Sequence, residues 1–209
     1  MESPVNTKPD RPTADLRFLL FWVVANTVAW AIGLISPLIV GIALFNAFSI
    51  EVATGESGGM TSLLGFAASI IVGITTLPIA ISVGQWLVLR RHIVKAIWWI
   101  PASVVGFIGG LIAIFFLSGN LIGWVVLGAM SAIPQWLILR RQLAGAGWWI
   151  PTGIIQVFIW RMPVVSTTDL VVADLVVPGV AGALVTGSVL LLLLRRRARR
   201  QIVQSSSEN

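Results

Sequence analysis

Long apolar runs separated by short polar segments dominate this chain. Six runs are continuously apolar, and most have the roughly twenty residues that a transmembrane helix needs. Because apolar and polar residues do not alternate within them, helices are favoured over membrane strands. The pattern predicts an all-α, integral membrane six-helix bundle that forms one domain over residues 17–200. The expected helices cover residues 18–47, 62–89, 98–117, 121–139, 148–161 and 170–194.

The fifth run is the shortest of the six. As a helix, residues 148–160 extend about 20 Å, which is less than the roughly 30 Å of a bilayer core. Arg161 can lengthen the span, because its long side chain can reach outward to the headgroups. A re-entrant segment is the alternative to a full crossing.

Composition and charge add an orientation to this picture. Hydrophobic residues make up 57% of the chain and charged residues 11%, too few to cover a water-soluble surface. Of the 14 lysines and arginines, all but Arg161 flank the first and sixth helices or fall in the segments 90–97 and 140–147. The positive-inside rule then places both termini in the cytoplasm. The polar segment 1–16 carries no signal peptide, and the tail 201–209 is expected to be disordered.

The basic residues have a simple interpretation as topological anchors, and nucleic-acid binding is not needed to explain them. An additional contact with anionic lipid headgroups is the alternative. The candidate headgroup contacts are Arg90, Arg91, Arg140, Arg141, Arg195 and Arg196.

An internal repeat links the apolar runs. The sequence Gln-Trp-Leu-x-Leu-Arg-Arg of residues 85–91 returns at 135–141, and a Trp-Trp-Ile-Pro follows each copy. Setting Trp22, Trp99 and Trp149 in register predicts three consecutive helical hairpins, over residues 17–91, 98–141 and 148–196. Repeats of two helices keep one orientation in the membrane.

Small residues recur every four positions in the first and third runs. Such stripes let helix backbones approach closely in lipid. We expect them to pack within the monomer, with a homo-oligomeric face as the alternative. The predicted packing residues are Ala25, Ala29, Gly33, Ala102, Gly106 and Gly110.

The sequence offers little chemistry for catalysis. There is no cysteine, and the single histidine, His92, lies among loop arginines. No carboxylate, lysine or histidine lies deep in a predicted helix, so a proton relay or haem site has no support. No Ser/His/Asp set, zinc-binding motif or P-loop is present. We therefore expect neither an enzyme nor a bound cofactor or metal.

Gln85 and Gln135 are the most distinctive polar residues, because both copies of the repeat carry them. Each precedes its Arg pair by five residues, about 7–8 Å deeper along a helix. A buried amide at that depth needs a hydrogen-bond partner. We predict equivalent interhelical bonds, with Trp86 and Trp136 anchored at the headgroups. A ligand held between these amides and the paired tryptophans is the alternative.

The repeated motifs resemble those of a group of bacterial multi-pass membrane proteins that is common in cyanobacteria. The resemblance rests on residues 85–91 and 135–141, each followed by Trp-Trp, and on the segment 22–33 of the first hairpin. It implies an integral membrane location and no catalytic activity. The three-hairpin plan is also similar to that of mitochondrial carriers, but the charged Pro-x-Asp/Glu-x-x-Lys/Arg motif of those carriers is absent.

Two functions are compatible with these features. The first is a non-enzymatic accessory, scaffold or lipid-interacting subunit, with anionic membrane lipids and a protein of a larger membrane complex as partners. The second is a small transporter or channel for an uncharged or weakly polar solute, which requires Asn26, Ser103 and Gln156 to face one axis. The expected location is the bacterial inner membrane, with the thylakoid membrane as the alternative.

Overall fold

The computed structural model describes residues 11–54, 59–161 and 171–207, and these are helical almost throughout. Two short 3₁₀ turns, η1 (Ala96–Trp98) and η2 (Ala146–Trp148), precede α3 and α5. No strand occurs within the described ranges, so the expected all-α class is confirmed for them. The α-helices are α1 (Arg11–Thr54), α2 (Gly59–Leu89), α3 (Trp99–Phe116), α4 (Leu121–Leu139), α5 (Trp149–Arg161) and α6 (Val171–Ser207).

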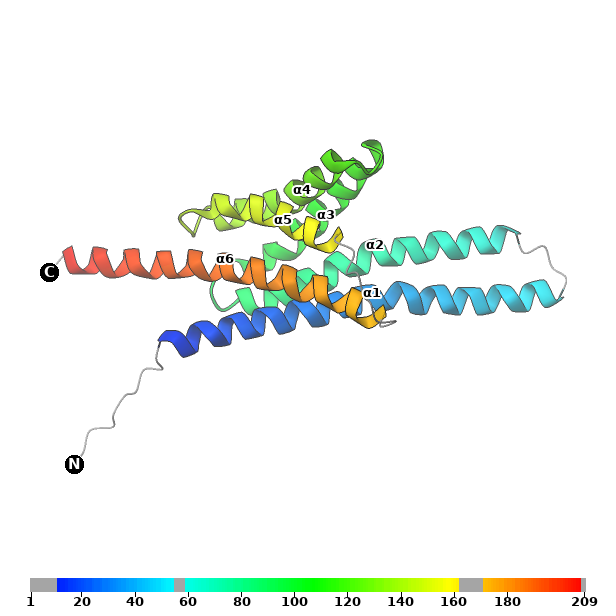
Figure 1. The fold of residues 1–209 in the computed structure, drawn as a ribbon, viewed down its shortest axis with the longest axis horizontal. Helices are drawn as coiled ribbons and strands as arrows, with labels where there is room; N and C mark the ends of the chain where they lie inside the picture. Colours follow the sequence, from blue (N-terminus) through cyan, green and yellow to red (C-terminus); the bar gives the residue numbers. More distant parts are fainter. Residues whose placement is uncertain (1–10, 55–58, 162–170, 208–209) are drawn as a thin grey trace, which may run out of the picture.

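Each helix packs on the next one along the chain, and α6 returns to pack on α1. The start of α1 lies beside the C-terminal part of α6. There, Nε of Arg195 donates a hydrogen bond of 2.9 Å to Asp15. Figure 1 shows this end of an elongated molecule, with the α1–α2 and α3–α4 hairpins diverging toward the other end. The six helices therefore form a closed sequence of neighbours around the bundle.

Within the described residues, five helices are long and apolar enough to cross a membrane, so the chain is a helical membrane protein. The fifth helix, α5, is not among them, because it has 13 residues. The candidate spans are Thr13–Leu44, Gly65–Leu89, Ala96–Phe116, Leu121–Leu139 and Val176–Arg200.

The first and last helices extend past the boundaries expected from hydropathy. The first helix runs from Arg11 to Thr54, and the last continues to Ser207. The tail from residue 201 was expected to be disordered; through Ser207 it is helical. Adding a residue to an existing helix fixes one residue per hydrogen bond, which is cheaper than starting a new helix. Helix propagation thus carries α1 and α6 past the ends of their apolar runs.

The described part of the bundle has two kinds of surface. Its largest buried side chains cluster near the end that carries the connections α2–α3 and α4–α5, and they include Trp22, Trp99 and Trp149. Away from this cluster, large apolar side chains are exposed, such as Phe66 and Phe115 at 69% and 81%. Exposed apolar sides suit contact with lipid tails, which are as apolar as the side chains themselves.

Glycines bring α3 and α4 into close contact. A Cβ placed on Gly106 would lie 2.5 Å from the carbonyl oxygen of Met130, and one on Gly110 would lie 2.9 Å from Cα of Leu127. In α1, a Cβ on Gly33 would lie 2.8 Å from Cα of Leu77. These three glycines of the predicted stripes therefore sit at backbone-to-backbone contacts inside the monomer.

The alanines of the stripes are placed less uniformly. Ala29 is buried, and its Cβ would lie 3.2 Å from a Cβ on Gly84 of α2. The carbonyl oxygen of Ala25 approaches the same glycine. Ala102 instead lines an open groove beside α4.

Candidate functional site

The two connections α2–α3 and α4–α5 share one backbone design. After each helix, the chain turns through matching bonds to the last leucine, from Ile93 N to Leu89 O and from Leu143 N to Leu139 O. The residue before each 3₁₀ turn is left-handed, with φ of 60° at Lys95 and 82° at Gly145. Glycine adopts this conformation freely, whereas a lysine does so at a cost.

Beneath the first connection, Gln85 joins three helices. It accepts a hydrogen bond of 2.7 Å from the indole Nε1 of Trp99 on α3. Its own Nε2 donates to Oδ1 of Asn26 on α1, at 2.9 Å. Asn26 in turn donates to the carbonyl oxygen of Trp22, one helical turn before it. Both polar atoms of the Gln85 amide are therefore used.

Beneath the second connection, Gln135 repeats this arrangement. The indole Nε1 of Trp149 on α5 donates to Oε1 of Gln135 at 2.7 Å, and Gln135 Nε2 donates to Oγ of Ser103 at 2.7 Å. Ser103 donates to the carbonyl oxygen of Trp99. Both glutamines thus make interhelical bonds of the same kind, as the repeat predicts.

A third indole closes the sequence of bonds. Trp22 of α1 is fully buried, and its Nε1 donates to Oγ1 of Thr186 on α6 at 3.1 Å. The position in α6 that corresponds to the two glutamines, five residues before an Arg pair, holds the buried Leu190. Thr186, one helical turn away, provides the acceptor instead, and the sequence register alone did not single it out.

The neutral, fully bonded network is suited to holding helices in register more than to holding a ligand. Trp99 and Trp149 meet edge to face with ring centroids 5.6 Å apart, so no flat molecule fits between them. Their sequence neighbours Trp98 and Trp148 are 62% and 66% exposed. In each Trp-Trp pair, therefore, one indole is a buried hydrogen-bond donor and the other is an anchor at the surface.

The remaining tryptophans of the repeat lie under arginines. The guanidinium of Arg90 is 5.4 Å from the ring centroid of Trp86, and that of Arg140 is 4.9 Å from Trp136. These are cation–π distances. Arg90 and Arg140 therefore each contact a tryptophan in the last turn of the helix that they follow.

A small chamber lies below the network. It has a volume of about 50 Å³, enough for a few water molecules. Gln85, Ser103, Gln135 and Gln156 contribute polar atoms to its wall. Ser131 also lines it, and its buried hydroxyl has no hydrogen-bond partner among the described residues. Gln156 and Ser103 thus share this interior space, while Asn26 joins them through Gln85.

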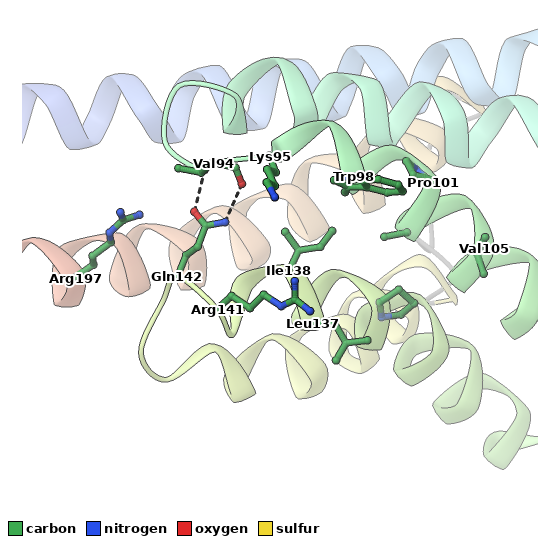
Figure 2. Close-up of a pocket in the computed structure, with 12 residues that line it drawn as sticks. Val94, Lys95, Trp98, Pro101, Val105, Leu137, Ile138, Arg141, Gln142 and Arg197 are labelled. Carbon is green, nitrogen blue, oxygen red and sulfur yellow. Dashed lines mark hydrogen bonds between the residues drawn. The ribbon is translucent and has the colours of Figure 1, made fainter.

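A much larger groove opens on the side of the bundle. It has a volume of about 810 Å³ and lies between the start of α3 and the end of α4. The connection α2–α3 and Arg197 of α6 complete it, as Figure 2 shows. Its lining residues are Val94, Lys95, Trp98, Pro101, Ala102, Val105, Pro134, Leu137, Ile138, Arg141, Gln142 and Arg197.

A side-chain clamp joins the two connections at this groove. Gln142 accepts a hydrogen bond from the backbone N–H of Val94 at 2.9 Å and donates to the carbonyl oxygen of the same residue at 2.8 Å. The clamp fixes the α2–α3 connection against the α4–α5 connection. It therefore sets the width of the groove where the cationic side chains enter.

The groove gathers only part of the arginine set that the sequence suggested. Arg141 lines it, whereas Arg195 pairs with Asp15. The Nη1 atom of Arg196 approaches Gly145 of the other connection. The groove adds Lys95 and Arg197, which sequence reasoning did not select. Neither is among the six candidate contacts: Lys95 was an orientation signal only, and Arg197 was considered for lipid contact only as part of the arginine run 195–200. Nothing local indicates that helix ends far apart in sequence meet.

His92 adds no positive charge to this region at neutral pH. Partial burial, and then the nearby Arg91, hold the pKa of its imidazole below the ordinary value of 6.5. The ring packs edge to face on Phe18 of α1, with centroids 5.2 Å apart. His92 thus serves as a neutral contact between the α2–α3 connection and α1.

Comparison with known proteins gives no relative for this chain: no family model, no curated protein and no solved structure matches it. Within the described residues, no group of histidine, cysteine, aspartate or glutamate side chains is suited to a metal ion. The network, the chamber and the groove are therefore the features of this chain that bear on its function.

Proposed function

We propose that this protein is a non-enzymatic integral membrane protein that binds anionic lipids at the end where its connections and helix termini meet. The observation that carries the proposal is the distribution of charge. In the described chain, the basic side chains gather at that end of an otherwise apolar bundle, and Arg161 is the exception. Clusters of lysine and arginine beside membrane helices attract anionic headgroups, at about 1 kcal/mol for each residue near the surface.

The proposal includes three hairpins with both termini in the cytoplasm. The short α5 is the difficult element, and its far end supports a crossing. The guanidinium of Arg161 lies 5.4 Å from the ring centroid of Trp124, in the first turn of α4. Since α4 has 19 residues, α5 reaches close to the far end of a helix that can span a bilayer. Arg161 then extends outward to the headgroups.

Lipid dependence tests this function. The protein is reconstituted in nanodiscs of phosphatidylcholine with or without phosphatidylglycerol, and its thermal unfolding is followed by circular dichroism. We expect the anionic lipid to raise the melting temperature at low salt, and the gain to shrink in 0.5 M salt because of screening.

The control variant is Arg161→Gln, which removes a cation from the other end of the bundle. It should keep the full response to phosphatidylglycerol. Equal melting temperatures in both lipid mixtures at low salt would refute a lipid-binding function.

The chamber favours a second candidate, the passage of a small uncharged solute. Its wall carries four amide or hydroxyl side chains besides the unpaired Ser131 hydroxyl. Permeation of urea or glycerol into proteoliposomes, followed by light scattering, tests this candidate. If the chamber is part of a path, Ser131→Leu should abolish a flux that the unmodified protein supports.

The similarity to cyanobacterial-type membrane proteins, and with it a bacterial inner or thylakoid membrane, remains part of the proposal. The repeated motifs at residues 85–91 and 135–141 are the features that carry this resemblance.

A further inference from the structure

We propose that the groove between α3 and α4 binds one anionic glycerophospholipid, with its phosphate at Lys95, Arg141 and Arg197 and its acyl chains toward Val105 and Leu137. This inference rests on the proposed lipid-binding function and assigns that function a single site. A discrete site differs from a general attraction, because it selects one molecule by both charge and shape.

Charge supports an anionic headgroup. Three cations reach the groove from three separate segments: Lys95 from the α2–α3 connection, Arg141 from the α4–α5 connection and Arg197 from α6. No carboxylate is among the lining residues. The one polar neutral side chain in the lining, Gln142, already uses its amide on Val94. A phosphate group can accept hydrogen bonds from Lys95 and Arg141, which reach in from opposite walls, and Arg197 adds positive charge at the end of the groove.

The order of residues along the groove supports an amphiphile over a free anion. Figure 2 shows Arg197 at one end, Lys95 and Arg141 reaching in from opposite walls, and Val105 at the other end. Leu137 lies one helical turn before Arg141, about 6 Å deeper along α4. The groove therefore changes from cationic to apolar in the direction in which α3 enters the membrane.

The size of the groove matches part of a lipid. Sites for small molecules are commonly about 300–1,000 Å³, and the groove measures about 810 Å³. That volume holds a headgroup, a glycerol unit and the upper part of the acyl chains. Since the groove opens on the apolar side of the bundle, the remaining chain length can lie in the bilayer. Trp98, which is 62% exposed, borders the site at the depth where tryptophan meets headgroups.

The α4–α5 connection shows what the side chain of Lys95 contributes to the groove. At the matching position it has Gly145, which adopts the same left-handed backbone without a side chain. Lysine at this position carries a backbone cost that glycine does not, yet it places an ammonium group at the groove. Lys95→Gly therefore removes the cation while giving the backbone the residue that its twin already uses. This variant separates lipid binding from folding.

The experiment measures binding of phosphatidylglycerol to the full-length protein by native mass spectrometry, with titration from detergent micelles. The groove variants are Lys95→Gly, Arg141→Gln and Arg197→Gln. The matched control is Arg161→Gln, whose cation lies over Trp124 in the first turn of α4, outside the groove lining and outside the basic end of the bundle.

We expect one phosphatidylglycerol to remain bound to the unmodified protein. Each groove variant should weaken binding roughly fivefold, the change that corresponds to about 1 kcal/mol per cation. The control variant Arg161→Gln should bind within twofold of the unmodified protein. A photoreactive group on the acyl chain should label peptides that contain Val105 or Leu137.

Three outcomes would overturn the site. Groove variants that bind like the unmodified protein, while phosphatidylglycerol still raises the melting temperature, would leave the general lipid function intact and refute the groove. Inorganic phosphate that displaces the lipid at equal concentration would indicate a free-anion site. Labelling spread evenly over all helices would indicate nonspecific contact with the bilayer.

Discussion

A glutamine in a membrane helix has an acceptor and a donor, and both need partners because the surrounding lipid tails offer none. Gln85 and Gln135 meet this requirement in the same way, with an indole on the acceptor and a side chain of the preceding odd-numbered helix on the donor. An indole N–H has one donor and no acceptor, so tryptophan gives the amide a single well-defined partner. Each residue pair thereby fixes the depth of one helix against another.

Substitution of Gln85 by leucine measures this contribution. The change leaves the indole N–H of Trp99 and the Oδ1 atom of Asn26 without their partner. We expect a loss of about 0.6–2 kcal/mol in the free energy of unfolding, measured by denaturant titration in mixed micelles.

Gln135→Leu should cost a similar amount, because Gln135 also accepts from an indole and donates to one side-chain oxygen, here the Ser103 hydroxyl. In a double-mutant cycle, Trp99→Phe should cost less in the Gln85→Leu background than in the unmodified protein. Additive losses would contradict a direct energetic link between the indole and the amide.

At the scale of the elements, the stripes of small residues set how closely helices approach. Gly106 matters most, because a side chain there would meet the backbone of α4, which has little freedom to move. Gly147, in η2, lies in open space with nothing within 4 Å of a Cβ. These two glycines make a matched pair for testing the packing.

Gly106→Ala should lower the free energy of unfolding by about 1–3 kcal/mol through overpacking, as measured in detergent. Gly147→Ala should stay within about 0.5 kcal/mol of the unmodified protein, as is usual for exposed positions. Equal stability of the two variants would mean that α3 and α4 do not touch at Gly106 in solution.

Sequence periodicity predicted the elements better than their contacts. Continuous apolar runs located all six helices, and the register of three tryptophans pointed to the indoles that lie in the network. Sequence periodicity did not distinguish Trp98 from Trp99, because two adjacent tryptophans give no indication of which side chain is buried and which is exposed. It also missed Thr186 and the groove lysine, since each gains its role from a helix more than forty residues away.

At the scale of the whole molecule, the packing of α6 on α1 brings the first and last helices together. The contact of α1 with α6 includes both the Trp22–Thr186 bond and the Asp15–Arg195 ion pair. An exposed ion pair adds little stability, so the buried bond and the packing around it carry more of this contact. Both chain ends are therefore expected on one side of the membrane.

Single cysteines test this topology, because the chain has none of its own. A membrane-impermeant maleimide added to whole cells should label a cysteine at Ser118, in the α3–α4 turn, and leave one at Gln204 unlabelled. A cysteine at Ser166, outside the described residues, reports on α5 and should be labelled if that helix crosses. Labelling at Gln204 from outside would refute the placement of the C-terminus in the cytoplasm.

The bond between Trp22 and Thr186 has a consequence for biosynthesis. Helices leave the ribosome in order, so the indole of Trp22 enters the membrane early while its acceptor is synthesised with the last helix. The indole donors of Gln85 and Gln135 are synthesised soon after them, because each donor is the tryptophan that begins the next helix. A nascent chain interrupted before α6 therefore holds an indole without its native partner. Completion of translation and closure of the bundle coincide, and a truncated chain remains open to the proteases that clear unfinished membrane proteins.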